Sequence, residues 1–276
     1  MKSMNPNASA NPPDASSEQA APSGGRSYSY NESFYRYIEA GSLRSASVVV
    51  PLVLRELSPS SVLDVGCGAG AWLAEYRNHG ITDYLGVDGA YLQQSSLLIS
   101  AEHFQSRNAA QPFELGRRFD IVQCLEVGEH VPEASSDTLI ENLVRHGDKV
   151  LFPAATPGQG GENHINEQTY EFWRRLFAKH GYKPFDLFRR MIEGVAEVES
   201  WYRYNMVLFV AETALPALSP ELLRSGLRDG QAIPAMTSQP FRIRARILSL
   251  LPMRCVSKIA LAKHRIVTAY RSLRGR

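Results

Sequence analysis

The sequence predicts an α/β fold, a doubly wound and mostly parallel sheet with helical additions at both ends of the chain. Three observations predict it. An apolar run ending in an acid leads into alternating glycines at residues 62–70, and a second apolar run ends in another acid at residues 84–88. Strand-like and helix-like segments then alternate as far as residue 210. Alternation of this kind places parallel strands in one sheet with helices on both faces.

The N-terminal part of the chain divides into two segments ahead of the sheet. Residues 1–26 hold Asn, Pro, Ser, Ala and Gly but no Leu, Ile, Val or Phe. Such a segment buries too little apolar surface to offset the entropy lost on ordering, so we expect a disordered tail. Residues 27–57 carry apolar and aromatic side chains at helical spacing and predict two helices.

Alternating glycines follow the first predicted strand, Ser61–Val65, and precede a predicted helix at Ala71–His79. They are Gly66, Gly68 and Gly70. Glycine adopts positive φ and has no Cβ, so backbone N–H groups in such a turn can approach a ligand at the start of the helix. Because a strand comes before the turn and a helix after it, the pattern predicts a nucleotide-binding site.

Two carboxylates narrow the choice of ligand. Asp88 ends the second predicted strand, eighteen residues beyond Gly70, about where a βαβ unit places the acid that binds ribose hydroxyls. Asp64 precedes the turn, where it would repel a pyrophosphate but suits an ammonium group. A ribose-bearing cofactor is therefore expected, with a dinucleotide in an NAD-type Rossmann domain as the alternative.

Further elements continue the alternation. Strands are expected near His103–Gln105, at Phe119–Leu125 and Lys149–Phe152, near Pro184–Phe188 and at Tyr204–Val210, and helices at Ser135–His146 and Glu167–His180. Open α/β sheets bind their ligands at the carboxyl ends of the strands, so residues after these strands are the candidates for chemistry.

The glycine turn and the acidic second strand resemble motif I and the following strand of the class I S-adenosylmethionine-dependent methyltransferases. The resemblance covers residues 28–212 and implies S-adenosylmethionine as cofactor. It also implies a seven-stranded, Rossmann-like sheet of order 3-2-1-4-5-7-6 with the last strand antiparallel. Helices at residues 27–57 cap the cofactor in this family, and packing at the sheet edge is the alternative. The implied cofactor-binding residues are Asp64, Gly66, Gly68, Gly70, Asp88, Asn108 and Leu125, where Asn108 replaces the acid that often contacts adenine.

Acids and an imidazole follow the fourth predicted strand. Glu126, Glu129 and His130 stand at i, i+3 and i+4 and share a face if this segment is helical. Converging carboxylates and an imidazole favour a divalent cation. The segment resembles the metal-binding segment of the ubiquinone-biosynthesis O-methyltransferases and of the small-RNA 3′-terminal 2′-O-methyltransferases. The latter add a histidine from a later loop, for which His164 is the candidate. Magnesium or manganese would then lie among Glu126, Glu129, His130 and His164.

Without a metal, the same residues would line the pocket, and His130, His164 or Glu129 would carry the acid–base chemistry. A hydroxyl needs such help to lose its proton, so both arrangements favour an oxygen acceptor. Residues 153–167 are expected to gate the acceptor, because their glycines hold no single shape. This loop and the following segments resemble bacterial methyltransferases of surface-polysaccharide and secondary-metabolite clusters. The expected function is O-methylation of a sugar, glycan or small secondary metabolite.

Two other functions are weighed against this one. Metal-dependent 2′-O-methylation of RNA would use the same acids and histidines, but the predicted catalytic domain is acidic and nucleic acid is not the expected partner. A non-catalytic S-adenosylmethionine-binding module would be expected to have lost these residues, and this chain keeps them.

The C-terminal segment has its own charge. Residues 241–276 hold ten Lys or Arg and no acid, so the net charge of +2 divides into +10 here and −8 in the other 240 residues. Interleaved apolar residues predict amphipathic helices that make peripheral contact with a membrane. RNA, the acidic domain itself or a second subunit are the alternative partners.

The predicted terminal segments leave a methyltransferase domain at residues 58–213 and a linker at residues 214–240.

The three cysteines, Cys67, Cys124 and Cys255, lack paired spacing and are expected to be reduced. No stretch has the length of a membrane span, and the N-terminus lacks the apolar core of a signal peptide. The expected location is the cytoplasm, with peripheral contact at the inner membrane.

Overall fold

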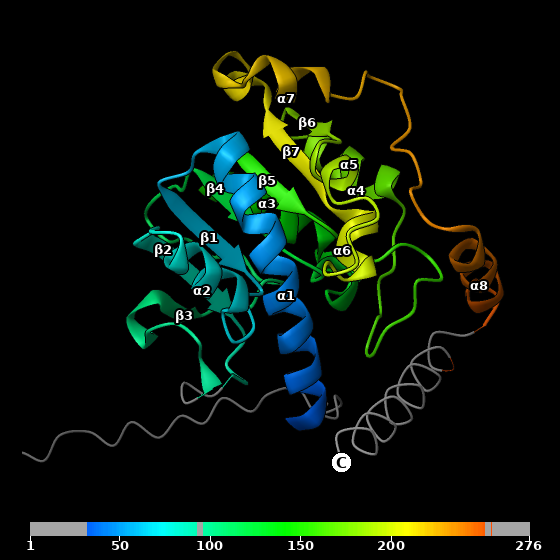
Figure 1. The fold of residues 1–276 in the computed structure, drawn as a ribbon, viewed down its shortest axis with the longest axis horizontal. Helices are drawn as coiled ribbons and strands as arrows, with labels where there is room; N and C mark the ends of the chain where they lie inside the picture. Colours follow the sequence, from blue (N-terminus) through cyan, green and yellow to red (C-terminus); the bar gives the residue numbers. More distant parts are fainter. Residues whose placement is uncertain (1–31, 93–95, 252–254, 256–276) are drawn as a thin grey trace, which may run out of the picture. The chain divides into compact units, whose positions relative to one another are not determined.

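A computed structural model describes residues 32–92, 96–251 and 255. Its centre is a seven-stranded sheet of order β3-β2-β1-β4-β5-β7-β6 (Figure 1). Strands β1 to β5 run parallel, and β7 is antiparallel to both β5 and β6. The strands are β1 Ser61–Val65, β2 Asp83–Asp88, β3 Phe104–Ser106, β4 Ile121–Gln123, β5 Lys149–Phe152, β6 Tyr182–Phe185 and β7 Val207–Ala211. The expected fold class and strand order are confirmed.

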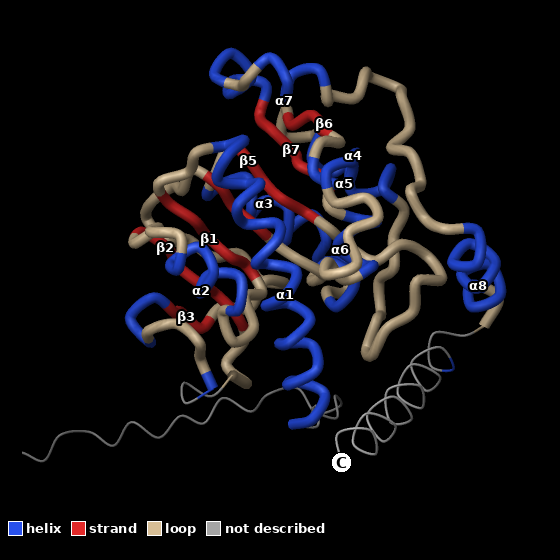
Figure 2. The backbone as a smooth tube through the Cα atoms, viewed as in Figure 1, coloured by secondary structure: helices blue, strands red, loops and turns tan. Residues whose placement is uncertain are grey.

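Helices cover both faces of the sheet (Figure 2). The helices are α1 Glu32–Leu57, α2 Ala71–Asn78, α3 Ser136–His146, α4 Tyr170–Ala178, α5 Phe188–Met191, α6 Ser200–Asn205, α7 Pro220–Arg224 and α8 Gln239–Ser249. Side chains of α1, α2, α5 and α6 share one buried hydrophobic cluster with one face of the sheet. Those of α3 and α4 share a second cluster with the other face. This two-layer cover is what a doubly wound sheet needs to bury both faces.

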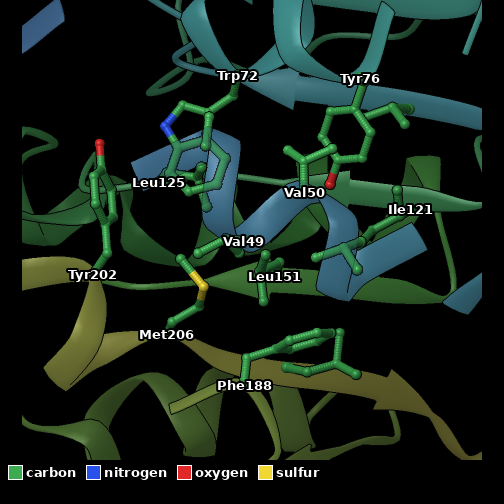
Figure 3. Packing of buried hydrophobic residues seen from close by; sticks show 14 of the residues in the cluster. Val49, Val50, Trp72, Tyr76, Ile121, Leu125, Leu151, Phe188, Tyr202 and Met206 are labelled. Carbon is green, nitrogen blue, oxygen red and sulfur yellow. The ribbon is translucent and has the colours of Figure 1, made fainter. Parts of the chain in front are cut away.

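The segment ahead of the sheet is one continuous helix, α1, where the sequence predicted two. Pro51 lies inside it without ending it. A proline inside a helix loses a backbone hydrogen bond, but the valines on both sides of it compensate, because Val49, Val50 and Val53 are fully buried against the sheet. Figure 3 shows Val49 and Val50 in the hydrophobic cluster with Trp72, Leu125 and Met206.

Several strand boundaries also differ from the prediction: the strand expected at Phe119–Leu125 is limited to Ile121–Gln123, and two others differ because a helix takes up their ends. The last strand begins at Val207 rather than at Tyr204, because residues 200–205 form α6. The sixth strand ends at Phe185, and Phe188 begins α5. In both places an aromatic residue with high strand propensity lies in a short helix that packs on the sheet. Burial against the sheet outweighs the local propensity of that residue.

Helix α1 is tied to α6 by polar contacts. The Ser42 and Tyr202 hydroxyls are hydrogen bonded at 3.1 Å, and the Arg44 guanidinium donates to Glu199 at 2.8 Å. The Tyr202 ring also packs edge-on against Trp72 of α2, with 5.0 Å between centroids. These contacts fix α6, which ends at Asn205, beside the candidate active site.

Several predicted segments lie partly or wholly outside the described residues. The tail at residues 1–26 is among them, and so is most of the basic segment beyond residue 251. The linker region, residues 214–240, contains part of the 3-10 helix Glu212–Ala217 and the whole of α7. Among the described residues, no helix combines the length and the apolar character that crossing a bilayer requires.

Candidate active site

The turn after β1 requires glycine at the positions that the sequence singles out. Gly66, Gly68 and Gly70 all have positive φ, at 80°, 53° and 85°. A Cβ on Gly66 would lie 2.3 Å from Cγ2 of Val127, and one on Gly70 would lie 2.9 Å from Ile99. The turn is therefore packed against the loop after β4, and any side chain at Gly66 would push the two apart.

Asp88 is bound to the glycine turn. Its Oδ2 accepts a hydrogen bond from the Gly68 N–H at 2.7 Å. Its Oδ1 accepts from the Gly89 N–H at 2.6 Å and from the Tyr91 hydroxyl. A hydroxyl donor on Oδ1 is the interaction that a ribose hydroxyl would make, so the position of Asp88 suits its predicted role.

Asp64 is buried beside Gln123, its partner in the parallel pairing of β1 and β4. Burial raises the pKa of the Asp64 carboxyl to about 7, although Gln123 opposes the shift and the charge of Asp88 adds to it. A nearby cation would favour its ionised form. This carboxyl therefore suits the predicted contact with an ammonium group.

The two remaining predicted cofactor residues lie in different surroundings. Asn108 is exposed, and its Oδ1 accepts a hydrogen bond from the Ala110 N–H at 2.9 Å, which closes a local turn. Leu125 is buried in the hydrophobic cluster beneath α1 (Figure 3). A role for either residue in cofactor binding stays a prediction.

The acids and histidines of the predicted cluster converge, but not on a helical face. Glu126 has a φ of +56°, and only Gly128–His130 form a short 3-10 turn. Even so, one ligand atom each from Glu129, His130 and His164 lie within 4.8 Å of one another. The expected shared helical face does not form, because Glu126 has a positive φ and lies outside the 3-10 turn. His164 joins the group because the Ile165 and Asn166 N–H groups both donate to the Glu129 carbonyl, at 2.9 and 3.0 Å.

Each histidine is oriented through its Nδ1. The Nδ1 of His130 lies 3.1 Å from the Asn163 carbonyl, which can only accept, so this nitrogen carries the proton. The Nδ1 of His164 lies 2.8 Å from the Glu167 carboxylate. Both rings therefore present Nε2 as the nitrogen with the lone pair, as histidine ligands of metals do. Burial, and then the charge of His164, lower the pKa of His130 to about 4, which keeps its imidazole neutral at neutral pH.

Glu129 is the unusual member of the group. It is fully buried, and neither carboxylate oxygen accepts a hydrogen bond within the described part of the chain. Burial, followed by the charge of Glu126, raises its pKa well above the usual range, and nearby backbone groups of Glu129 and Ala155 offset only part of the shift. A buried carboxylate without a partner is costly, and a cation bound among these residues would supply the missing partner. The donor set therefore fits a divalent metal ion.

Glu126 stands beside this group and is held by amides. Its Oε2 accepts from Gln159 Nε2 at 3.0 Å, and its Oε1 accepts from Asn205 Nδ2 at 3.3 Å. Asn205 Nδ2 also donates to the side-chain oxygen Oε1 of Gln159 at 2.8 Å, and Asn205 Oδ1 accepts from the Tyr170 hydroxyl at 3.0 Å. Burial raises the pKa of Glu126, while Asn205 is the strongest opposing influence. The carboxylate lies outside the group of three but borders it.

Comparison with known proteins finds a family model that matches part of these features. Residues 37–152 match a family model described as a methyltransferase domain. These residues are similar to a methyltransferase domain, and they make up less than half of the 276 residues of the chain. The matched residues include the glycine turn, Asp88 and the segment from Glu126 to His130, whereas His164, Gln159 and Asn205 lie beyond them.

Relatives and solved structures agree with the domain. The chain is 36% identical over 104 residues to a ubiquinone biosynthesis O-methyltransferase of Pseudomonas fluorescens, which covers 35% of this chain and 44% of the relative. It is 28% identical over 131 residues to one of Coxiella burnetii, covering 41% and 53%. The chain thus matches about half the length of these relatives. A sugar N-methyltransferase from Streptoalloteichus has the same fold, with a TM-score of 0.51, 18% identity and coverage of 70% and 99%.

Beyond the matched residues, Glu167 organises the loop of the methyltransferase domain that carries His164. Its carboxylate accepts from the Gly158 and Gly160 N–H groups at 2.8 and 2.7 Å as well as facing His164. A Cβ on Gly161 would lie 1.9 Å from His164 Nε2, so the backbone of Gly161 packs against the imidazole and only glycine fits there. The loop expected to hold no single shape is thus fastened by one carboxylate.

Sequence reasoning missed Glu167, Gln159 and Asn205. Glu167 had a usable signal, because it stands three residues after His164 and follows a run of glycines whose backbone N–H groups need acceptors. Gln159 and Asn205 had none, since they meet Glu126 only after α6 and the loop have folded over the end of β4.

Proposed function

We propose that this protein transfers the methyl group of S-adenosylmethionine to a hydroxyl oxygen of a sugar, a glycan or a small secondary metabolite. The observation that carries the proposal is the convergence of Glu129, His130 and His164 directly beside the cofactor turn. Val127, within two residues of Glu129, is the side chain against which Gly66 packs. The curated relatives described above, which are named as O-methyltransferases, support an oxygen acceptor.

Binding of the cofactor is assigned to the turn and two acids. Asp88 would hold the ribose hydroxyls, while Asp64 would balance the ammonium group of the methionine moiety. The N–H groups of the glycine turn would face the ligand at the start of α2. This arrangement would direct the sulfonium methyl toward the loop after β4, where the acids and histidines lie.

The acceptor must lie in line with the bond between sulfur and methyl carbon, and its oxygen must lose a proton. His164 is placed to accept that proton at Nε2, because Glu167 holds the opposite nitrogen and stabilises the imidazolium that forms. The new oxygen–carbon bond then forms as the sulfur–carbon bond breaks, which releases S-adenosylhomocysteine.

Glu129, His130 and His164 are also the residues that would hold a divalent cation, magnesium or manganese, with Glu126 at its border. Such a cation, when bound, would lower the pKa of an acceptor hydroxyl. The unpartnered carboxylate of Glu129 and the two oriented imidazoles support this assignment. With or without the cation, the same residues would act on the same atom, the hydroxyl oxygen of the acceptor.

The test is transfer of isotope-labelled methyl groups to a panel of acceptors that represent each class, including catechols, free sugars and an RNA oligonucleotide. We expect O-methylated product from a sugar or catechol class, and the Glu129→Gln variant should lose more than about a hundredfold in turnover. Glu133→Gln is the matched control, since Glu133 is exposed four residues away. Label on nitrogen, or label on RNA alone, would contradict the proposal.

A further inference from the structure

Helix α8 has a capping residue at its N-terminus and a proline in its first turn. The Ser238 hydroxyl accepts a hydrogen bond from the Phe241 N–H, and Pro240 occupies the first turn, where no backbone hydrogen bond is lost. The helix lies at the edge of the molecule, beyond α6 and the loop that carries His164 (Figure 1). It therefore has an inner and an outer face.

The inner face packs on the candidate active site. The Phe241 ring lies edge-on to Tyr204 of α6, with 5.2 Å between centroids, and Leu248 is buried. A Cβ on Gly158 would lie 2.1 Å from the Ala245 carbonyl oxygen, so the helix backbone rests directly on the glycine loop. Gly158 is one of the two glycines bound by Glu167, which orients His164. Helix α8 is thus in contact with the acceptor loop, residues 153–167, which carries His164.

The outer face is apolar and exposed. Its large apolar side chains recur at helical spacing and continue just past the helix end. They are Ile243, Ile247, Leu250 and Leu251, with exposed fractions of 59%, 58%, 84% and 39%. The other exposed large apolar residues in the described part of the chain are Tyr91, Leu223 and Ile165, and Ile165 is next to His164. Four such residues on one short helix mark a binding surface rather than ordinary scatter.

Arginines flank this apolar stripe. Arg242, Arg244 and Arg246 are exposed on its two sides, and no acid occurs between Ser238 and Leu251. At 100° per residue, these arginines fall between about 60° and 130° from the centre of the stripe, on the border between the apolar and inner faces. An apolar stripe with cations along its borders is the arrangement of a helix that lies in the plane of a membrane interface.

We propose that the outer face of α8 docks on a bilayer surface that contains anionic lipids. Charge decides between the candidate occupants, because a second copy would bring the same arginines against each other. Nucleic acid would be attracted by the arginines but would leave the isoleucines and leucines exposed. Only a lipid surface offers phosphate groups and an apolar layer together.

Docking on this face would hold the loop that carries His164 on the far side of α8, about 10 to 12 Å from the lipid surface. The acceptor is then a molecule tethered to the membrane, whose reacting group reaches that distance from the surface. This statement about the acceptor rests on the proposed function, whereas docking itself does not. A chain that binds vesicles but methylates nothing would separate the two.

The test is sedimentation of the full chain with vesicles of phosphatidylcholine, with or without phosphatidylglycerol. We expect binding only with phosphatidylglycerol, and weaker binding when salt rises from about 0.1 M to about 1 M. Ile243→Asp combined with Ile247→Asp should weaken binding more than about tenfold. Leu223→Asp is the control, because Leu223 is 45% exposed on α7. Unchanged S-adenosylmethionine affinity would show that the variants are folded.

Three results would overturn the proposal. The first is an absence of binding to anionic vesicles by the full chain. The second is vesicle binding that the isoleucine variant leaves unchanged, which would assign it to another part of the chain. The third is dissociation of an oligomer by the same variant without loss of vesicle binding, which would make the face an interface between copies.

Discussion

The two halves of the active site differ in how the chain builds them. The cofactor half comes from one continuous stretch, residues 61–91, in which Gly68 donates directly to Asp88. The acceptor half is assembled from three distant segments, because Glu126 meets Gln159 and Asn205 across 33 and 79 residues. The first half depends on backbone conformation, and the second depends on buried side-chain contacts. Changes in the two halves should therefore have different consequences.

The largest expected effect is a loss of stability from a substitution in the cofactor half. Gly66→Ala adds a Cβ at positive φ and 2.3 Å from Val127, so we expect a loss of about 2 to 5 kcal/mol in the free energy of unfolding. Gly68→Ala has the same kind of φ with nothing within 4 Å, and should lose about 1 to 2 kcal/mol. Urea denaturation without cofactor measures both. Equal losses would show that packing against the loop after β4 is not what fixes the turn.

A smaller effect is expected in the acceptor half from Glu167→Gln. The change removes the charge that orients His164 and binds two loop N–H groups, so metal affinity should fall about 10- to 100-fold. The acceptor KM should rise, and S-adenosylmethionine affinity should stay unchanged. Glu171→Gln is the control, since Glu171 lies exposed on α4. Loss of cofactor affinity in the Glu167 variant would contradict the separation of the two halves.

A further expected effect is a pH dependence in the cofactor half. The pKa of Asp64 is about 7 in the folded chain against 3.8 ordinarily, so the folded state binds more protons between these values. The contribution of Asp64 to the free energy of unfolding therefore falls as pH rises through this window. The ionised carboxylate attracts the ammonium group, so S-adenosylmethionine affinity should rise as pH approaches 7 and level off above it. Calorimetry at a series of pH values measures this, and Asp64→Asn should remove the dependence.

The sequence predicted the cofactor half closely because its determinants are local. Positive φ at Gly66, Gly68 and Gly70 and the position of Asp88 follow from spacing within one βαβ unit. The strand order followed from the family resemblance. The continuity of α1 through Pro51 did not follow, because burial of the neighbouring valines outweighed a local helix-breaking signal.

In the acceptor half, the sequence predicted residues but not their arrangement. Glu129, His130 and His164 do converge, yet Glu126 has a positive φ instead of continuing a helix. Contacts such as Asn205 with Glu126 depend on where α6 lies, and the last two residues of α6, Tyr204 and Asn205, were expected to be strand. Spacing along the chain carries no information about such long-range contacts, so the amides around Glu126 could not be foreseen.

The most direct measurement is the metal content of the purified chain, combined with titration by S-adenosylmethionine before and after chelation. The account predicts cofactor binding that survives chelation, and about one divalent ion per chain that chelation removes. The Glu129→Gln variant should lack the ion and still bind the cofactor. Cofactor binding without any metal would leave His164 to accept the proton alone. A failure to bind S-adenosylmethionine would contradict the role given to Asp88 and the glycine turn.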